Sequence, residues 1–239
     1  MEQNKTGKYF KYAIGEIILV VIGILIALQI NNWNQEQKLK AEETKMLRNF
    51  KSSVVRDSLN IQSYIETFNS VNESIHILLD HMERDLQYHD SLNWHFTSST
   101  QLWTPRIDQE VFSSLSSSDL NIISNDSLKK EIISYYSFAK RRFDVNISRY
   151  SSIIEDASKN VFNSRFNALW NNSWNNPKSS NTKRHMIPNN YEELKKDKEF
   201  RYYLESLRNQ LYFFVRDPLD DAGGKTKSLL HSLDKELQK

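Results

Sequence analysis

An apolar stretch from Ala13 to Ile30 places the strongest constraint on how this chain folds. As a helix it would rise about 27 Å, close to the roughly 30 Å hydrocarbon core of a bilayer. The stretch is apolar on every side, and nothing else in the chain is apolar enough to bury it in a core. We therefore expect a membrane anchor at residues 13–33, between a basic tail at 1–12 and a helical domain at 34–239.

A cleavable signal peptide is the closest alternative to an anchor. The lysines at positions 5, 8 and 11 supply the basic start that signal peptides have. However, the apolar run is longer than a usual signal core, and Ala27-Leu28-Gln29 lacks the small residues of a cleavage site. A core helix buried in a soluble protein is the other alternative. We favour the uncleaved anchor.

The flanks of the anchor bear on its depth and orientation. Tyr12 precedes the span and Trp33 follows it, at the two positions where interfacial aromatic residues are common. Lys and Arg are nearly balanced across the span, but only Glu2 offsets the lysines of the tail, whereas several glutamates follow Trp33. We expect the tail in the cytoplasm and the large domain outside it.

Five residues within the span call for an explanation. Gly23 and Ala27 form a small-xxx-small pair, and Gly15 lies two turns earlier on nearly the same side, so these three are candidates for helix–helix contact. Small residues are also common in membrane helices without such a role. Glu16 is an ionisable intramembrane residue and a candidate for proton coupling, but it is shallow enough to reach the interface or a tail lysine. Gln29 is shallow at the other end.

Composition removes several classes of function. The chain has no cysteine, which excludes disulfides, thiolate catalysis and cysteine-ligated metal sites. A net charge of +2 among 239 residues gives no reason to expect a nucleic-acid partner. His76 and Asp80 have the i, i+4 spacing of metal ligands, but one such pair is a weak signal. We find no catalytic motif, and we expect no enzyme activity, cofactor or resident metal.

Heptad spacing dominates the sequence after the anchor. Positions seven residues apart from Leu47 to Met82 are all apolar, and most positions three residues further on are apolar too, with Asp57 and Asp85 as exceptions. No Gly or Pro interrupts the chain between Gly23 and Pro105. This pattern predicts one long coiled-coil or bundle helix that continues from the anchor.

The remainder of the chain also predicts helices. A ladder of apolar residues with steps of three and four follows Asn125, which is a plausible N-cap, and Asn190 is another. Pro218 and the pair Gly223-Gly224 predict a break before the last helix. Aromatic residues crowd the helix before that break, and we expect them to pack in the core rather than to form a partner surface: Tyr202, Tyr203, Tyr212 and Phe213. The fold class expected is all-α, an antiparallel bundle of long helices.

The anchor sequence carries a family resemblance. The run GKYFKYAIGEIILVVIGILIALQINNWN, from Gly7 to Asn34, resembles the N-terminal anchor of an uncharacterised family of Gram-negative bacterial membrane proteins, and it includes Glu16, Gln29 and Trp33. A looser match runs from Val111 to Tyr136. The resemblance implies a single-pass protein of the bacterial inner membrane with a periplasmic domain. It implies no activity.

Three function classes remain open. The first is a membrane-anchored scaffold or accessory subunit of an envelope complex, which associates with itself or with another membrane protein. The second is a ligand-sensing domain, which would need a partner to relay its signal because the tail is only twelve residues long. The third is a proton-coupled subunit that uses Glu16. The uniform anchor, the heptad stripe and the absence of a catalytic motif favour the first.

Overall fold

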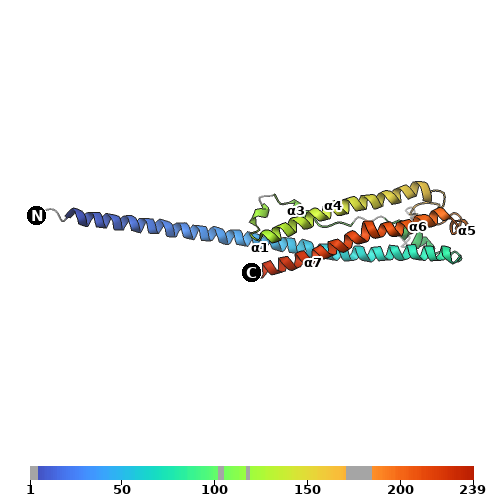
Figure 1. Cartoon of the computed structure of the whole chain (residues 1–239), viewed down its shortest axis with the longest axis horizontal. Coiled ribbons are helices and arrows are strands. Elements are labelled where there is room, and N and C mark those ends of the chain that lie inside the picture. The colour runs from blue at the N-terminus through green and yellow to red at the C-terminus, as the bar shows by residue number, and fades with distance from the viewer. Residues whose placement is uncertain (1–4, 102–104, 117–118, 171–184) are drawn as a thin grey trace, which may run out of the picture.

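The computed structural model describes residues 5–101, 105–116, 119–170 and 185–239, and of residues 5–13, 139, 140 and 147 it describes the backbone alone. These residues form helices and connecting segments, with no strand among them, as the sequence predicts. Figure 1 shows a long stalk that leads into a bundle of helices. In chain order the elements are α1 Lys5–Glu83, α2 Leu92–Ser99, α3 Glu110–Ser113, η1 Asp119–Ile122, α4 Asp126–Ala157, η2 Ser158–Phe162, α5 Tyr191–Leu194, α6 Lys198–Leu211, η3 Tyr212–Arg216 and α7 Asp217–Leu237.

Helix α1 is continuous over 79 residues and carries both the apolar stretch and the heptad stripe. Its N-terminal half extends away from the bundle, and its C-terminal half runs along the bundle (Figure 1). The absence of Gly and Pro after Gly23 explains the continuity, because no residue on this path removes a backbone donor or favours a turn. The helix ends where Asp85 adopts a left-handed conformation with φ of 53°.

Three long helical segments form the bundle: α1, α4 and the segment from α6 to α7. Ser124, just before α4, donates to Glu43 of α1, and the Tyr135 hydroxyl further along α4 donates to Asp57. Helix α4 therefore runs parallel to α1. Arg216, just before α7, donates to Asn69 of α1, whereas Asp234 near the end of α7 pairs with Lys51 of α1, so α7 runs antiparallel to both.

The heptad stripe of α1 forms the core of the bundle, as the sequence predicts. Apolar residues at both sets of stripe positions are buried: Leu47, Phe50, Val54, Ile61, Phe68, Val71, Ile75 and Leu78. Of the two polar exceptions, Asp85 lies beyond the end of α1 and is exposed, whereas Asp57 is fully buried. One polar residue of the stripe is thus buried together with the apolar ones.

The chain returns from the distal end of α1 to the start of α4 through short elements. Helix α2 packs beside α1, and the connection then passes through α3 and η1. Asn125 caps α4 as predicted, because its side chain accepts hydrogen bonds from the backbone N–H groups of Ser127 and Leu128. Asn190 likewise caps the short helix α5.

The predicted break at Pro218 and Gly223-Gly224 is wrong, because one continuous helical path runs from α6 through η3 to α7. Pro218 lacks a backbone N–H, and its ring would clash with the carbonyl of Phe214 in a regular α-helix. The chain accommodates this with the π-helix η3, whose wider turn relieves the contact. Three consecutive steps of four, from Leu207 to Leu219, keep the buried face continuous through the wider turns.

Candidate functional site

One helix near the N-terminus is long and apolar enough to cross a membrane, and its apolar window has no buried residue. Residues 14–42 are all exposed, so the anchor touches no other part of the described chain. Gly23 illustrates this, because a Cβ atom built on it meets no heavy atom within 4 Å. A helix of this composition without protein neighbours is consistent with a single-pass membrane protein.

The polar and small residues proposed for the span remain without neighbours in the single chain. Glu16, Gln29 and Ala27 are exposed, and a Cβ atom added to Gly15, like one added to Gly23, would meet open space. Eight residues at about 100° each separate Gly15 from Gly23 by about 80°, so Gly15 lies at the edge of the face that holds Gly23 and Ala27. Whether these residues mediate contact stays a prediction.

The two interfacial aromatic residues differ in how far the structure describes them. Trp33 is 58 % exposed and lies on α1 one turn after the apolar stretch, and its interfacial role stays a prediction. Tyr12 belongs to α1, but its side chain lies outside the described residues.

Asp57 is the most unusual polar residue of the bundle, and the sequence marks it only as an exception in the stripe. One carboxylate oxygen accepts a 2.7 Å hydrogen bond from the backbone N–H of Asp108, and the other accepts a 2.9 Å hydrogen bond from the Tyr135 hydroxyl. Ser53, one turn earlier, donates to the carbonyl of Asp108. Together these contacts hold the segment before α3 against α1 and join α4 to α1.

Burial raises the pKa of Asp57 to about 6, because the charged form loses its hydration inside the core. The hydrogen bonds from Asp108 and Tyr135 favour the carboxylate and limit the rise in pKa. The guanidinium of Arg56 pairs with Asp108 at 2.5 Å and also favours the charged form of Asp57, whereas the carboxylate of Asp108 opposes it.

Thr226 of α7 extends the polar contacts of Asp57 and Tyr135. The Thr226 hydroxyl donates to the carbonyl of Ala222 at 2.8 Å and also lies 3.2 Å from the Tyr135 hydroxyl. Because Tyr135 of α4 donates to Asp57 of α1, these contacts connect α1, α4 and α7 through one series of polar side chains.

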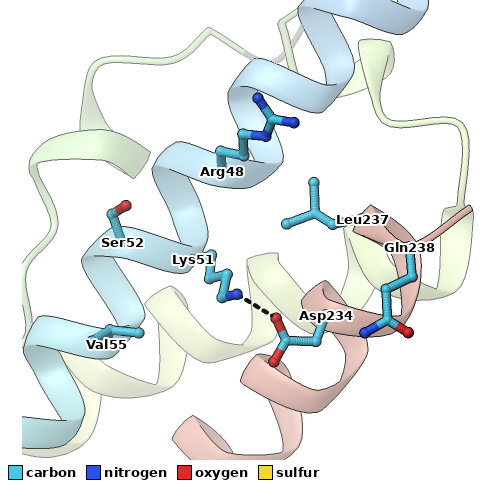
Figure 2. A pocket seen from close by; sticks show the side chains of 7 residues that line it. All are labelled: Arg48, Lys51, Ser52, Val55, Asp234, Leu237 and Gln238. Carbon is cyan, nitrogen blue, oxygen red and sulfur yellow. Dashed lines mark ion pairs between the residues drawn. The ribbon is translucent and has the colours of Figure 1, made fainter.

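An open groove of about 700 Å³ lies between α1 and α7, near the C-terminal end of α7. Figure 2 shows that Arg48, Lys51 and Val55 line it from α1 and that Asp234 and Leu237 line it from α7. The ammonium group of Lys51 lies 2.6 Å from the carboxylate of Asp234. The lining therefore combines two apolar side chains, Val55 and Leu237, with charges of both signs.

Two further sets of residues singled out in the sequence are the metal-spaced pair His76 and Asp80 and the aromatic residues around α6. Asp80 pairs with Arg84 at 3.2 Å, and no cluster of three metal-binding side chains occurs within the described residues. Tyr202, Tyr212 and Phe213 are exposed by more than half, so the expectation that they pack in the core is wrong. Helical spacing identified a wide aromatic face but could not tell which part of it meets α1.

A comparison of the sequence with known protein families gives one match. The model of DUF6090, described as a family of unknown function, matches residues 16–175, about two thirds of the chain. The chain belongs to this family. No curated protein and no solved structure matches it.

The residues matched by the family model include some of the features described above and exclude others. The DUF6090 region contains most of the anchor, Asp57 with its partners on α4, and the α1 side of the groove, whereas α6 and α7 follow it. Membership in DUF6090 does not indicate an activity for this chain, because the function of the family is unknown.

Proposed function

We propose that this protein is a membrane-anchored helical scaffold or accessory subunit of an envelope complex, without catalysis of its own. The observation that carries the proposal is the anchor helix, which has no partner within the described chain and continues without a break into the bundle. A rigid connection of this kind holds a folded domain at a fixed height above the membrane. The anchor and the adjoining face of α1 then remain free for other proteins.

The proposed location is the bacterial inner membrane, with the tail in the cytoplasm and the bundle in the periplasm. The balance of charges on the two flanks supports this orientation. Single cysteines introduced at Glu2 and at exposed Tyr202 test it, because the natural chain contains no cysteine. An impermeant thiol reagent applied to spheroplasts should label Tyr202→Cys and spare Glu2→Cys. The reverse labelling contradicts the orientation.

The test of the scaffold function is the mass of the full-length protein after mild detergent extraction from its native membrane. We expect an assembly larger than a single 28.3 kDa chain with its detergent, either of several copies or with a companion in fixed ratio. Gly23→Leu, which adds bulk to the face of the anchor, should reduce that assembly, whereas Leu25→Ile serves as a control on another face. A single chain without companions would contradict the proposal.

Glu16 provides a separate test of the proton-coupled alternative. Glu16→Gln removes the titratable group and keeps the hydrogen-bonding shape. Full complementation of a deletion strain by Glu16→Gln excludes a role in proton transfer. Loss of complementation with normal membrane levels and normal assembly favours proton coupling over the scaffold.

A further inference from the structure

Residues 105–116, which we call the strap, lie against α1 and α4 and include the short helix α3. Little of the strap is packed, because Pro105 and Ile107 are its only buried residues. Phe112 adds a stacked contact with Tyr136 of α4, at 4.8 Å between the ring centroids. A segment with so few buried side chains opens at a lower free energy than the helices beneath it.

Asp108 fastens the strap to one turn of α1. Its backbone N–H donates to Asp57 at 2.7 Å, and its carbonyl accepts from the Ser53 hydroxyl at 3.3 Å. Its carboxylate accepts from the guanidinium group of Arg56. The attachment of the strap at this point therefore depends on three neighbouring side chains of α1.

Asp57 is the member of this contact set whose charge responds to mild acid. The hydrogen bond with the Asp108 side chain raises the pKa of Arg56, so the guanidinium group stays charged. Burial raises the pKa of Asp108, but its hydrogen bonds with Arg56 and the N–H of Glu110 outweigh burial, so the pKa is lowered and the carboxylate stays ionised. A change of pH between 5 and 7 therefore alters the charge of Asp57 and leaves these neighbouring charges unchanged.

The carboxylate of Asp57 is buried and forms no ion pair with the described residues. Its hydrogen bonds come from two neutral groups, the backbone N–H of Asp108 and the Tyr135 hydroxyl. Arg56 pairs with Asp108 instead. Helices α4 and α7 add only uncharged hydroxyl groups to this cluster: Tyr135, Tyr136 and Thr226. The charged form of Asp57 therefore lacks both water and a cation.

Opening of the strap is the smallest movement that hydrates Asp57. Moving Asp108 away from α1 exposes the oxygen that accepts its N–H, whereas exposing the other oxygen requires α4 to separate from α1. Neutral hydrogen bonds do not fully replace the hydration of a carboxylate, so ionised Asp57 favours the open strap. We propose that the strap is a pH-sensitive cover, closed over Asp57 while this residue carries a proton and released when the residue ionises. The proposal goes beyond the scaffold function and does not depend on it.

The pKa of Asp57 defines the pH range of the response. Burial raises this pKa to about 6 under the closed strap, and hydration in the open state moves it toward the ordinary value of 3.8. The closed strap is therefore most stable below about pH 4, and this extra stability is lost as the pH rises through about 6. Linkage predicts that the equilibrium constant for opening increases by up to about ten-fold from pH 5 to pH 7.

Hydrogen exchange of the full-length protein in detergent, followed by mass spectrometry, measures this opening. After correction for the intrinsic effect of pH on exchange, peptides from the strap should lose protection several-fold between pH 5 and pH 7. They should also exchange faster than peptides from α4 at both pH values, because the strap opens without unfolding of the bundle. Strap peptides that exchange only together with α4, or with equal protection at both pH values, overturn the proposal.

Asp57→Asn removes the charge and keeps the size of the side chain and an oxygen that accepts hydrogen bonds. The strap of this variant should have equal protection at pH 5 and pH 7. The matched control is Asp234→Asn, which removes an exposed carboxylate that pairs with Lys51 and should retain the several-fold loss. A response to pH that persists in Asp57→Asn overturns the proposal.

Arg56→Gln provides the test if Asp57→Asn does not fold, because the side chain of Arg56 is 55 % exposed. Arg56 fastens Asp108 and also favours the charged form of Asp57. Its loss should therefore loosen the strap at every pH and move the midpoint of the response to higher pH. A purely structural role of Arg56 would loosen the strap without moving the midpoint, and that result contradicts the coupling between Asp57 and the strap.

Discussion

The Tyr135 hydroxyl donates a 2.9 Å hydrogen bond to the buried carboxylate of Asp57, which joins α4 to α1 through a polar contact inside an apolar core. The contact is central because Asp57 also accepts the backbone N–H of Asp108. Without Asp57, the segment before α3 would leave a backbone donor unpaired, at a cost of about 1–3 kcal/mol. The bundle thus depends on a carboxylate that burial disfavours in its charged form.

Asp57 should make the bundle more stable in mild acid. Its pKa is about 6 in the folded protein against an ordinary value of 3.8, so between these values the folded state binds a proton that the unfolded chain does not. The free energy of unfolding should therefore fall by up to about 3 kcal/mol in total as the pH rises from about 3 to about 7, and then level off. Asp57→Asn should abolish this change, as measured by thermal melts at each pH.

The control for Asp57 is Asp234→Asn, which removes an exposed carboxylate from the pair with Lys51. Its pH profile should parallel that of the natural protein, because an exposed pair contributes little to stability. Identical pH profiles for the natural protein and Asp57→Asn would show that Asp57 does not titrate in this range.

Asp197 should respond to pH in the opposite direction. It pairs with Arg165 at 2.7 Å, which lowers the pKa of the carboxyl group, and it caps α6 by accepting the N–H groups of Glu199 and Phe200. Its contribution is present above the ordinary pKa of about 4 and is lost as the pH falls through the lowered value. Asp197→Asn keeps the cap and loses the ion pair, whereas Asp197→Ala loses both.

At neutral pH, Asp197→Ala should therefore be about 1 kcal/mol less stable than Asp197→Asn in chemical unfolding monitored by circular dichroism. Ser228→Ala is a suitable control, because it removes a hydrogen bond from an exposed position on α7. Equal stability of the two Asp197 variants would show that the cap contributes nothing to the fold.

The sequence predicted the parts of the fold that depend on local periodicity. The anchor, the stripe of α1 and the caps at Asn125 and Asn190 follow from residue spacing and side-chain chemistry alone. The sequence did not predict that α4 runs parallel to α1, because that depends on how the chain between them returns. It also did not reveal the partners of Asp57, since Asp108 and Tyr135 are 51 and 78 positions away.

The expectation of a break before α7 was wrong for a specific physical reason. Pro218 and two glycines are strong signals for a turn, but proline can also be accommodated by a wider helical turn, as in η3. The buried face of this segment, from Leu211 through Leu219 to Leu229, supplies enough packing to outweigh the weak helix propensity of Gly223 and Gly224. Packing of this buried face therefore keeps the segment helical where the local sequence favours a turn.

The two helical glycines should differ in how much side chain they tolerate. A Cβ atom on Gly223 would lie 3.7 Å from Ile61, whereas one on Gly224 meets nothing within 4 Å. Gly224→Ala should stabilise the protein by about 0.5–1 kcal/mol, because alanine favours helix. Gly224→Leu should remain folded normally, whereas Gly223→Leu should lose about 1–3 kcal/mol by overpacking against α1. Chemical unfolding of the four proteins, natural included, measures these differences.

The bundle should fold without its anchor. Residues 14–42 are exposed throughout, and Leu47 is the first buried residue of the core. A chain of residues 36–239 therefore keeps every core contact and should show full helicity and one cooperative melt in buffer without detergent. The matched control is a chain of residues 60–239, which loses Phe50, Val54 and Asp57 and should not fold.

If residues 36–239 aggregate or melt without cooperativity, the anchor must stabilise the bundle through contacts made in the membrane. That outcome would also mean that the exposed face of α1 is covered in the native protein.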